Sequence, residues 1–309
     1  IGGGAFRGLR SLSAVISHIN TPFNISSNVF VIDENWNSQT QKYDYTPSSA
    51  TLYVPIGSTS SYKAIEGWTM FADIVEGDYN EIEIDNITYS YSESTLTAVV
   101  IGSNFSDYNQ NVTIKNSVTI NGVDYEVKSI GAGAFIDNGR ISSLIVSSGI
   151  ETIAQSAFQS CWNLKSVQLP SSLTTIGNSA FQSCNNLRKI EIPSSIDSLG
   201  NYAFANCGNL LYVTSHIQTP FNINGSVFCS SSYWSGGTQV FEKNTATLYV
   251  PEGTKSAYEA IDGWNMFAEI VEGEMTEETI DGIIYSYNSS TQTATVVGSD
   301  FSEHRKVTI

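Results

Sequence analysis

The residues of this sequence that could do chemistry are few and scattered. The best metal-type pattern is the alternating run Asp33, Asn35 and Asn37, with Asp44 at the twelfth place. Oxygen ligands at alternate positions suit Ca²⁺, but the sixth place carries Ser38 where such a loop needs glycine. The matching places of a related later segment lack carboxylates, being Ser231, Tyr233 and Ser235. We therefore expect neither a metal nor a cofactor.

No set of catalytic residues converges in the sequence. His18 and His216 occupy equivalent places in a long repeat, which favours a turn or capping role, and His304 stands alone. The motifs HExxH, CxxC and GxSxG do not occur. The glycine runs at 2–4 and 131–133 lie in repeat turns, where close backbone packing explains them. The sequence predicts a protein that is not an enzyme.

The cysteines follow a repeat. Cys161, Cys184 and Cys207 are 23 residues apart, so they occupy one repeat position with parallel side-chain directions. A disulfide framework is one interpretation. Parallel directions fit a buried ladder of free thiols better than disulfide geometry, so we expect free thiols. The state of Cys229, outside this ladder, is left open.

The elements that would position these residues are set by an Ala-Phe ladder. The pair recurs at 134–135, 157–158, 180–181 and 203–204, each time after an apolar–small step such as Ile176-Gly177. A period of this length is typical of a solenoid, in which each repeat buries its apolar face against its neighbours. We expect Phe to fill the centre of each coil, while small residues allow close packing in the turn.

A short strand is predicted in each repeat, and strands of successive coils should form one parallel sheet. The segments 141–147, 164–170 and 187–193 carry apolar residues at their first, fourth and sixth places, which should point inward. The fold class expected is therefore a β-rich solenoid with parallel strands on one face and turns or short helices on the other.

A second period of 196 to 198 residues divides the chain. Segment 17–25 returns at 215–223, and Ala50–Pro55 returns at Ala246–Pro251. An Asn121-Gly122 pair predicts a β-hairpin, Ile87 to Ile101 should pair with itself, and 60–68 and 256–264 should be short helices. The domains expected are listed here by range: the end of a repeat array with its closing cap (1–77), a β-hairpin opening cap (78–128), 23-residue repeats (129–215), a closing cap (216–273) and the start of another opening cap (274–309).

Composition limits the partners. The 309 residues include 30 acidic and 14 basic side chains, for a net charge of -16. Such a chain repels nucleic acid and anionic membranes, and no stretch approaches the roughly 18 apolar residues of a spanning helix. Few Lys and Arg among abundant Ser, Thr, Asn and Tyr is typical of exported bacterial proteins. Because residues 1–6 already match the repeat, we expect a longer parent chain with its anchor outside this sequence.

The repeat resembles a known family. The pattern Leu-x-x-Val-x-Leu-Pro-x-x-Leu-x-x-Ile-Gly-x-x-Ala-Phe-x-x-Cys, complete from Leu164 to Cys184, is similar to the BspA-type leucine-rich repeat of bacterial surface proteins. With its caps the resemblance spans nearly the whole chain. It implies a right-handed solenoid, export to the cell surface, and adhesion to host proteins or other cells. One departure is Asn138, which stands where the next repeats have cysteine.

Two surfaces are candidates for binding a partner. The outward positions of the strand face are expected to include Lys165, Gln168, Arg188, Lys189, Glu191, Tyr212, Thr214 and Tyr249. A mixed row of charge and tyrosine suits protein recognition, although an ordinary solvated face is the simpler interpretation. Long polar loops at 31–49 and 229–245 carry Trp36 and Trp234, which either stack on a ligand or fold back to close the cap.

The function expected is that of a non-enzymatic, extracellular, cell-surface adhesion protein that binds a protein partner. A carbohydrate-binding protein that uses the loop aromatics is the alternative, and a structural spacer is a third.

Overall fold

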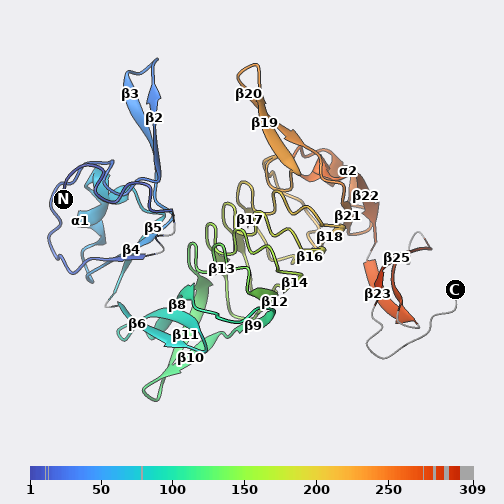
Figure 1. Cartoon of the computed structure of the whole chain (residues 1–309), viewed down its shortest axis with the longest axis horizontal. Helices are drawn as coiled ribbons and strands as arrows, with labels where there is room; N and C mark the ends of the chain where they lie inside the picture. The colour runs from blue at the N-terminus through green and yellow to red at the C-terminus, as the bar shows by residue number, and fades with distance from the viewer. Residues whose placement is uncertain are drawn as a thin grey trace.

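The structure is a computed structural model that describes residues 1–10, 12, 14–77, 79–273, 275–280, 283–288 and 292–299. His304, and the end of the segment 274–309 expected to open another cap, lie outside these residues. Figure 1 shows a first unit at the N-terminal end, then a long stack of coils, then a separate three-stranded sheet.

The first unit, up to residue 77, has its own apolar core around Trp68, Phe30 and Phe71. Its parallel sheet has the order β1-β4-β5, and a hairpin stands beside it. The bounds are β1 Ala14–Ile16, β2 Asp33–Asn37, β3 Lys42–Thr46, β4 Thr51–Val54, β5 Asp73–Glu76, α1 Thr59–Lys63 and the 3-10 turn η1 Glu66–Thr69.

Antiparallel strand pairs lead into the stack and belong to the same mixed sheet as one of its rows, because β8 pairs in parallel with β11. Strand β11 pairs with β10 through the predicted Asn121-Gly122 turn, and β7 pairs with β8, so both expected self-pairings are confirmed. Both turn residues have positive φ, as a type I′ turn requires. The bounds are β6 Tyr79–Ile84, β7 Ile87–Ser92, β8 Thr97–Ser103, β10 Ser117–Ile120 and β11 Val123–Ile130.

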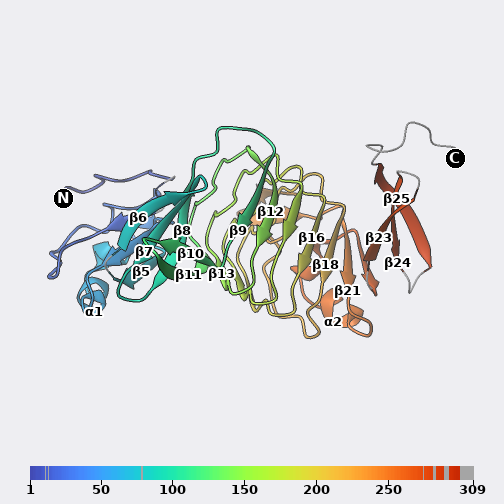
Figure 2. The same cartoon turned by 90° about the horizontal axis from the view of Figure 1, so that it is seen from below.

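Two rows of parallel strands build the stack. Pairing joins residues one repeat apart, such as Ser143 with Ser166 and Thr152 with Thr175. One row, which we call the strand face, is seen side by side in Figure 2. Its strands form two hydrogen-bonded sheets, β14-β12-β9 and β16-β18-β21-β22, and not the single sheet expected. It comprises β9 Gln110–Ile114, β12 Ile141–Val146, β14 Ser166–Gln168, β16 Lys189–Ile192, β18 Tyr212–Ser215, β21 Thr247–Val250 and β22 Glu269–Glu272. The opposite row continues from β11 through β13 Thr152–Ile153, β15 Thr175–Ile176 and β17 Ser198–Leu199.

The remaining elements follow the stack. The hairpin β19–β20 projects from it in Figure 1, and β23, β24 and β25 form the separate sheet. Their bounds, with the short helices between them, are β19 Ser231–Ser235, β20 Thr238–Glu242, α2 Lys255–Glu259, the 3-10 turn η2 Trp264–Met266, β23 Met275–Ile280, β24 Ile283–Asn288 and β25 Thr293–Ser299.

Stacked phenylalanine rings run through the centre of the coils, as the ladder predicts. Ring centroids of Phe135, Phe158, Phe181 and Phe204 are 4.8 to 5.3 Å apart, and Phe228 adds another ring at 5.3 Å. All five rings are buried. Small residues beside the rings are required, because a Cβ added at Gly177 would lie 2.6 Å from the backbone nitrogen of Gln155.

The predicted free thiols are confirmed. All four cysteines are unpaired and buried. Each Sγ of the ladder lies within hydrogen-bonding distance of the Phe carbonyl oxygen in the preceding coil, at 3.1 Å for Cys161 to Phe135 and 3.3 Å for Cys184 to Phe158. In the first coil Asn138 takes the cysteine position and donates instead to Ser103 Oγ, at 2.9 Å. The departure from the repeat therefore joins the stack to the sheet that precedes it.

The closing segments of the two units use the same hydrogen bonds. Tyr62 Oη donates to Ile19 at 2.8 Å, and its counterpart Tyr258 donates to Ile217 at 2.7 Å. The indoles of Trp68 and Trp264 likewise donate to backbone oxygens at 2.9 and 3.0 Å. The long period of the sequence thus corresponds to a repeated packing arrangement.

Two sequence expectations are wrong. The segments 31–49 and 229–245 are not open loops but contain the antiparallel hairpins β2–β3 and β19–β20. Gly236 and Gly237 both have positive φ, which gives a tight turn, and cross-strand aromatic pairs such as Trp36 with Tyr43 fill one side. The helices expected at 60–68 and 256–264 are shorter, because each breaks into a 3-10 turn around its tryptophan.

Removal of a central ring tests the importance of the phenylalanine stack. We expect Phe181→Ala to lower the free energy of unfolding by about 3–5 kcal/mol, because a fully buried ring leaves a cavity between two coils. The control Ile145→Ala removes an exposed side chain of β12 and should cost less than about 1 kcal/mol. Urea denaturation followed by circular dichroism measures both, and equal losses would contradict the proposed dependence.

The buried thiols predict a loss of stability in alkali. Burial raises the pKa of Cys207 to about 12 and that of Cys184 well above its ordinary range. An unfolded thiol has a pKa of about 8.5, so above that pH the unfolded chain releases protons that the folded chain retains. The free energy of unfolding should therefore fall between about pH 8.5 and pH 10, before tyrosines titrate.

The control for this prediction is the triple variant Cys161→Ala/Cys184→Ala/Cys207→Ala, in which the fall should be shallower. Urea denaturation at a series of pH values measures the slopes. Parallel slopes for the two proteins, or rapid labelling of the folded protein by a thiol reagent, would show that the ladder is not buried as described.

Candidate binding surface

The register of the strand face sorts its side chains into columns. Lys189 pairs with Tyr212, and Tyr212 pairs with Thr247, so residues one coil apart lie beside each other. Alternate residues of each strand point inward, as the burial of Ile190 and Ile192 shows. Residues between the inward ones form the outer columns. Neighbouring outer side chains on this face therefore come from successive coils, one coil spacing apart, as well as from alternate residues of one strand.

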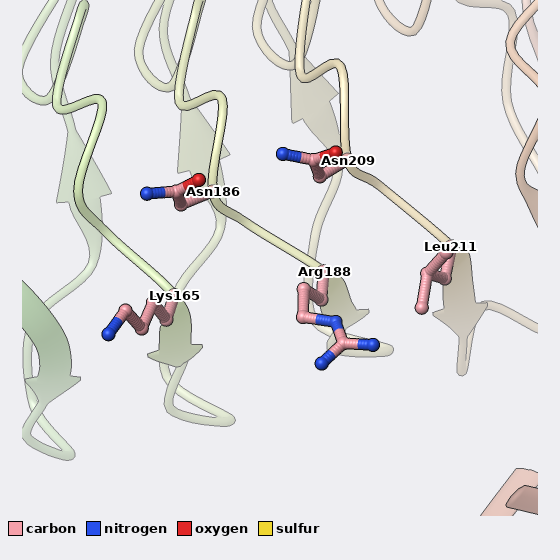
Figure 3. Close-up of a pocket in the computed structure, with 5 residues that line it drawn as sticks. All are labelled: Lys165, Asn186, Arg188, Asn209 and Leu211. Atoms are coloured by element: carbon pink, nitrogen blue, oxygen red, sulfur yellow. The ribbon is translucent and has the colours of Figure 1, made fainter. Parts of the chain in front are cut away.

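A groove lies across the starts of β14, β16 and β18. It has a volume of about 540 Å³ and is lined by Lys165, Asn186, Arg188, Asn209 and Leu211. Figure 3 shows the two asparagines in one column and Lys165, Arg188 and Leu211 in the next. Backbone hydrogen bonds fix the chain at the groove. The backbone nitrogen of Lys165 donates to the carbonyl oxygen of Ser142, and that of Leu211 donates to the carbonyl oxygen of Arg188, both at 2.8 Å.

The groove is locally basic in an acidic chain. Its lining holds the cations of Lys165 and Arg188 but no carboxylate, whereas the whole chain has a net charge of -16. The asparagine amides add both donors and acceptors, and Leu211 adds an exposed apolar side chain. Chemically, this arrangement can accept an anionic ligand that also offers hydrogen bonds and a small apolar contact.

Further along the same face the charges are mixed. Gln168 and Glu191 are exposed, whereas Lys189 is half-buried. His216 Nε2 lies 3.7 Å from Glu191 Oε2, and the nearby imidazole of His216 lowers the pKa of the Glu191 carboxyl. The structure therefore places Lys165 and Arg188 in the groove, and Gln168, Lys189 and Glu191 on the adjoining strands.

The expectation that Tyr212 and Thr214 are presented to solvent is wrong. Both lie in outer columns, but only 6% and 7% of their surface is exposed. Thr214 lies opposite Tyr249 on β21, and the ring of Tyr212 meets the ring of Tyr249 edge-on at 6.1 Å. Tyr249 itself is half-buried, and burial raises the pKa of its hydroxyl. These three residues form a packed end to the outer face.

Trp36 and Trp234 stand on the two hairpins and do not fold back to close the caps. They are 56% and 71% exposed. Trp36 packs edge-on against Tyr43 at 5.1 Å, and Phe241 and Gln239 fix the second hairpin to Tyr202, with a hydrogen bond of 2.7 Å from Gln239. Each tryptophan is thus presented by a two-stranded hairpin, and Tyr202 contacts the second hairpin.

Sequence reasoning missed an aromatic cluster beside the groove. Trp162 is 47% exposed and lies against Gly139, one repeat earlier, while the guanidinium of Arg140 lies 4.1 Å from the centre of the Tyr108 ring. A usable signal existed in the sequence. The column that contains Trp162 has glycine one coil before it, Asn185 one coil after it and Gly208 two coils after it, so the large residue faces a vacant position.

The calcium-type run does not form a cation loop. Asp33, Asn35 and Asn37 lie on the straight strand β2, and Asp33 accepts a hydrogen bond from Arg10 at 2.9 Å. The side-chain amide of Asn37 donates a hydrogen bond to the carboxylate of Asp44 at 2.9 Å. Within the described residues no group of three or more His, Cys, Asp or Glu side chains could hold a metal ion. In the same part of the chain, no helix is long and apolar enough to cross a bilayer.

The coils, their columns and the groove define a strand-rich repeat protein with few helices. Residues 110–235 match the family described as BspA type Leucine rich repeat region, in six copies. Residues 110–235 therefore carry BspA-type leucine-rich repeats, which confirms the resemblance drawn from the Leu164–Cys184 pattern. Among curated proteins no match to the sequence was found.

Solved structures of other leucine-rich-repeat proteins are similar. A protein from Bacteroides capillosus is 26% identical with a TM-score of 0.38, over 43% of this chain and 97% of that chain. The pneumococcal vaccine antigen PcpA is 15% identical with a TM-score of 0.45, over 72% of this chain and 56% of that one. A structure described as a leucine rich cell surface protein from Faecalibacterium prausnitzii is 14% identical with a TM-score of 0.35, over 72% and 62%.

The exposure of the hairpin tryptophan predicts a difference in stability between the variants Trp234→Ala and Trp264→Ala. We expect Trp234→Ala to change the free energy of unfolding by less than about 0.5 kcal/mol, because a surface side chain is removed. Trp264→Ala, in the core of the same unit, should cost about 3–5 kcal/mol. Urea denaturation measures both variants, and a large loss for Trp234→Ala would mean that this ring is buried after all.

Proposed function

We propose that this chain is a non-enzymatic binding protein of the cell surface that recognises an extracellular protein partner through the strand face. The proposal treats the coils at 129–215 as a right-handed solenoid, with 78–128 and 216–273 as its caps. The observation that carries it is the groove, where Lys165 and Arg188 form a basic site without a carboxylate in its lining. Repeat stacks commonly bind partners on such extended surfaces.

The charge of the groove indicates a partner with an acidic segment. At physiological ionic strength the Debye length is about 8 Å, so distant carboxylates of this chain are largely screened at the groove. Cations at the surface of the groove then attract the ligand locally. Export to the cell surface is supported by the composition, which is low in Lys and Arg and rich in Ser, Thr, Asn and Tyr.

Charge reversal in the groove tests this function. We expect Lys165→Glu/Arg188→Glu to weaken binding to an immobilised panel of extracellular matrix proteins by about tenfold or more, because attraction becomes repulsion. Lys243→Glu, an exposed cation outside the lining, is the matched control and should bind as the native chain does. Surface plasmon resonance measures binding. Binding that survives the double reversal would exclude the groove as the site.

A carbohydrate-binding function is the second candidate, because Trp36 and Trp234 are exposed on projecting hairpins. An exposed aromatic face can stack on the apolar face of a sugar ring. A glycan array probed with the native chain and with Trp36→Ala/Trp234→Ala tests it. Signals lost only in the variant would support this function, and a blank array would remove it.

A further inference from the structure

We propose that Trp162, together with Arg140 and Tyr108, is the anchor of the partner-binding site, and that the partner is an acidic peptide segment carrying a bulky apolar residue. This inference rests on the proposed function, since it extends the same binding site to side chains beyond the groove. The apolar residue of the partner would pack on Trp162 while its carboxylates meet Lys165 and Arg188.

Trp162 is held as a rigid platform. A Cβ added to Gly139 would lie only 2.1 Å from both Cε2 and Cζ2 of the Trp162 ring, so the indole rests directly on the backbone of the preceding coil. An exposed ring that is already fixed loses little conformational entropy when a partner covers it. This placement separates Trp162 from the hairpin tryptophans, which lie on two-stranded ribbons that project from the first unit and from the stack.

Arg140 and Tyr108 extend the platform. Arg140 directly follows Gly139, and its guanidinium stacks on Tyr108 while Nη1 donates to the backbone oxygen of Ser106 at 2.6 Å. Asn163, next to Trp162, donates to Asn109 at 3.1 Å. These contacts hold the segment around Tyr108 against the first two coils, so that two exposed aromatic rings and a guanidinium gather at one place.

The platform and the groove are neighbours. Asn163 belongs to the same column as Asn186 and Asn209, which line the groove, and Lys165 is only three residues beyond Trp162. Residues of type Trp, Tyr and Arg carry most of the binding energy at protein interfaces. An aromatic anchor beside a pair of cations therefore fits one partner chemistry, an acidic segment with an apolar side chain, better than a purely anionic ligand.

Two substitutions test the anchor without disturbing the fold. Trp162→Asn introduces the residue that the next coil has at this position, Asn185. Gly139→Ala retains Trp162 but displaces its ring, because the added Cβ cannot coexist with it. Gly208→Ala is the matched control in the same column, where a Cβ would meet nothing within 4 Å. Thermal unfolding of each variant establishes that the fold is retained.

The probe is a displayed random peptide library selected on the native chain, from which the strongest binder is synthesised with a fluorescent label. We expect enriched peptides to combine Asp or Glu with Trp, Phe or Leu. In fluorescence polarisation, Trp162→Asn should weaken binding by about 30-fold or more, as at an interface hot spot, and Gly139→Ala should also weaken it. Gly208→Ala should have no effect. Raising NaCl to about 1 M should weaken binding, since the Debye length falls to about 3 Å.

The outcomes separate this inference from the proposed function. Peptides that need Lys165 and Arg188 but bind Trp162→Asn and Gly139→Ala normally would overturn the anchor and leave the groove as the site. Peptides that need none of these residues would overturn both. A library without binders, together with glycan binding that is lost in Trp162→Asn, would replace the peptide partner with a carbohydrate and overturn the inference.

Discussion

The contact on which the rest of this structure depends is the face-to-face stacking of phenylalanine rings from successive coils. Centroid distances of 4.8 to 5.3 Å match the spacing of about 4.8 Å between hydrogen-bonded strands, so the rings and both rows of strands rise together. Small residues beside the rings and thiols that point at the carbonyl oxygens of the preceding coil follow from this spacing. Because the interior is fixed in this way, every outer column repeats at the same distance, and substitutions on the surface can change binding chemistry without changing the fold.

Much of this interior could be predicted from the sequence, because repetition makes each position visible several times. The ladder at Phe135 to Phe204, the buried thiols and the Asn121-Gly122 hairpin all follow from local spacing and turn chemistry. The outer face was harder. Tyr212 and Thr214 lie in the expected columns, yet neighbouring strands bury them, and burial of this kind depends on the size of side chains one coil away rather than on position within the strand. Trp162 was missed for the same reason, since the position of its ring depends on the absence of a side chain at Gly139 in the preceding coil.

The net charge of the chain and the local charge of the groove have opposite signs. A chain with 30 acidic and 14 basic residues would be expected to repel acidic partners at low ionic strength, where screening is weak. Many of its exposed cations are used locally, as in the pairs of Arg10 with Asp33 and Lys255 with Glu259. The lining of the groove brings two cations and two amides together and includes no carboxylate. Recognition there is short-ranged, which favours specificity through close contact over attraction of any anion from a distance.

The two units share more than their cores, and this bears on how such a chain could act. Each displays an exposed tryptophan on a hairpin, but the hairpins are fixed differently: Arg7 and Arg10 form ion pairs with the first, whereas Tyr202 holds the second through Gln239 and Phe241. Since the supporting contacts differ while both tryptophans are exposed, the exposed ring is what the two hairpins have in common. The groove and the Trp162 platform lie on the long stack of coils. A chain of such units would therefore present the hairpin rings repeatedly, where weak contacts add through avidity.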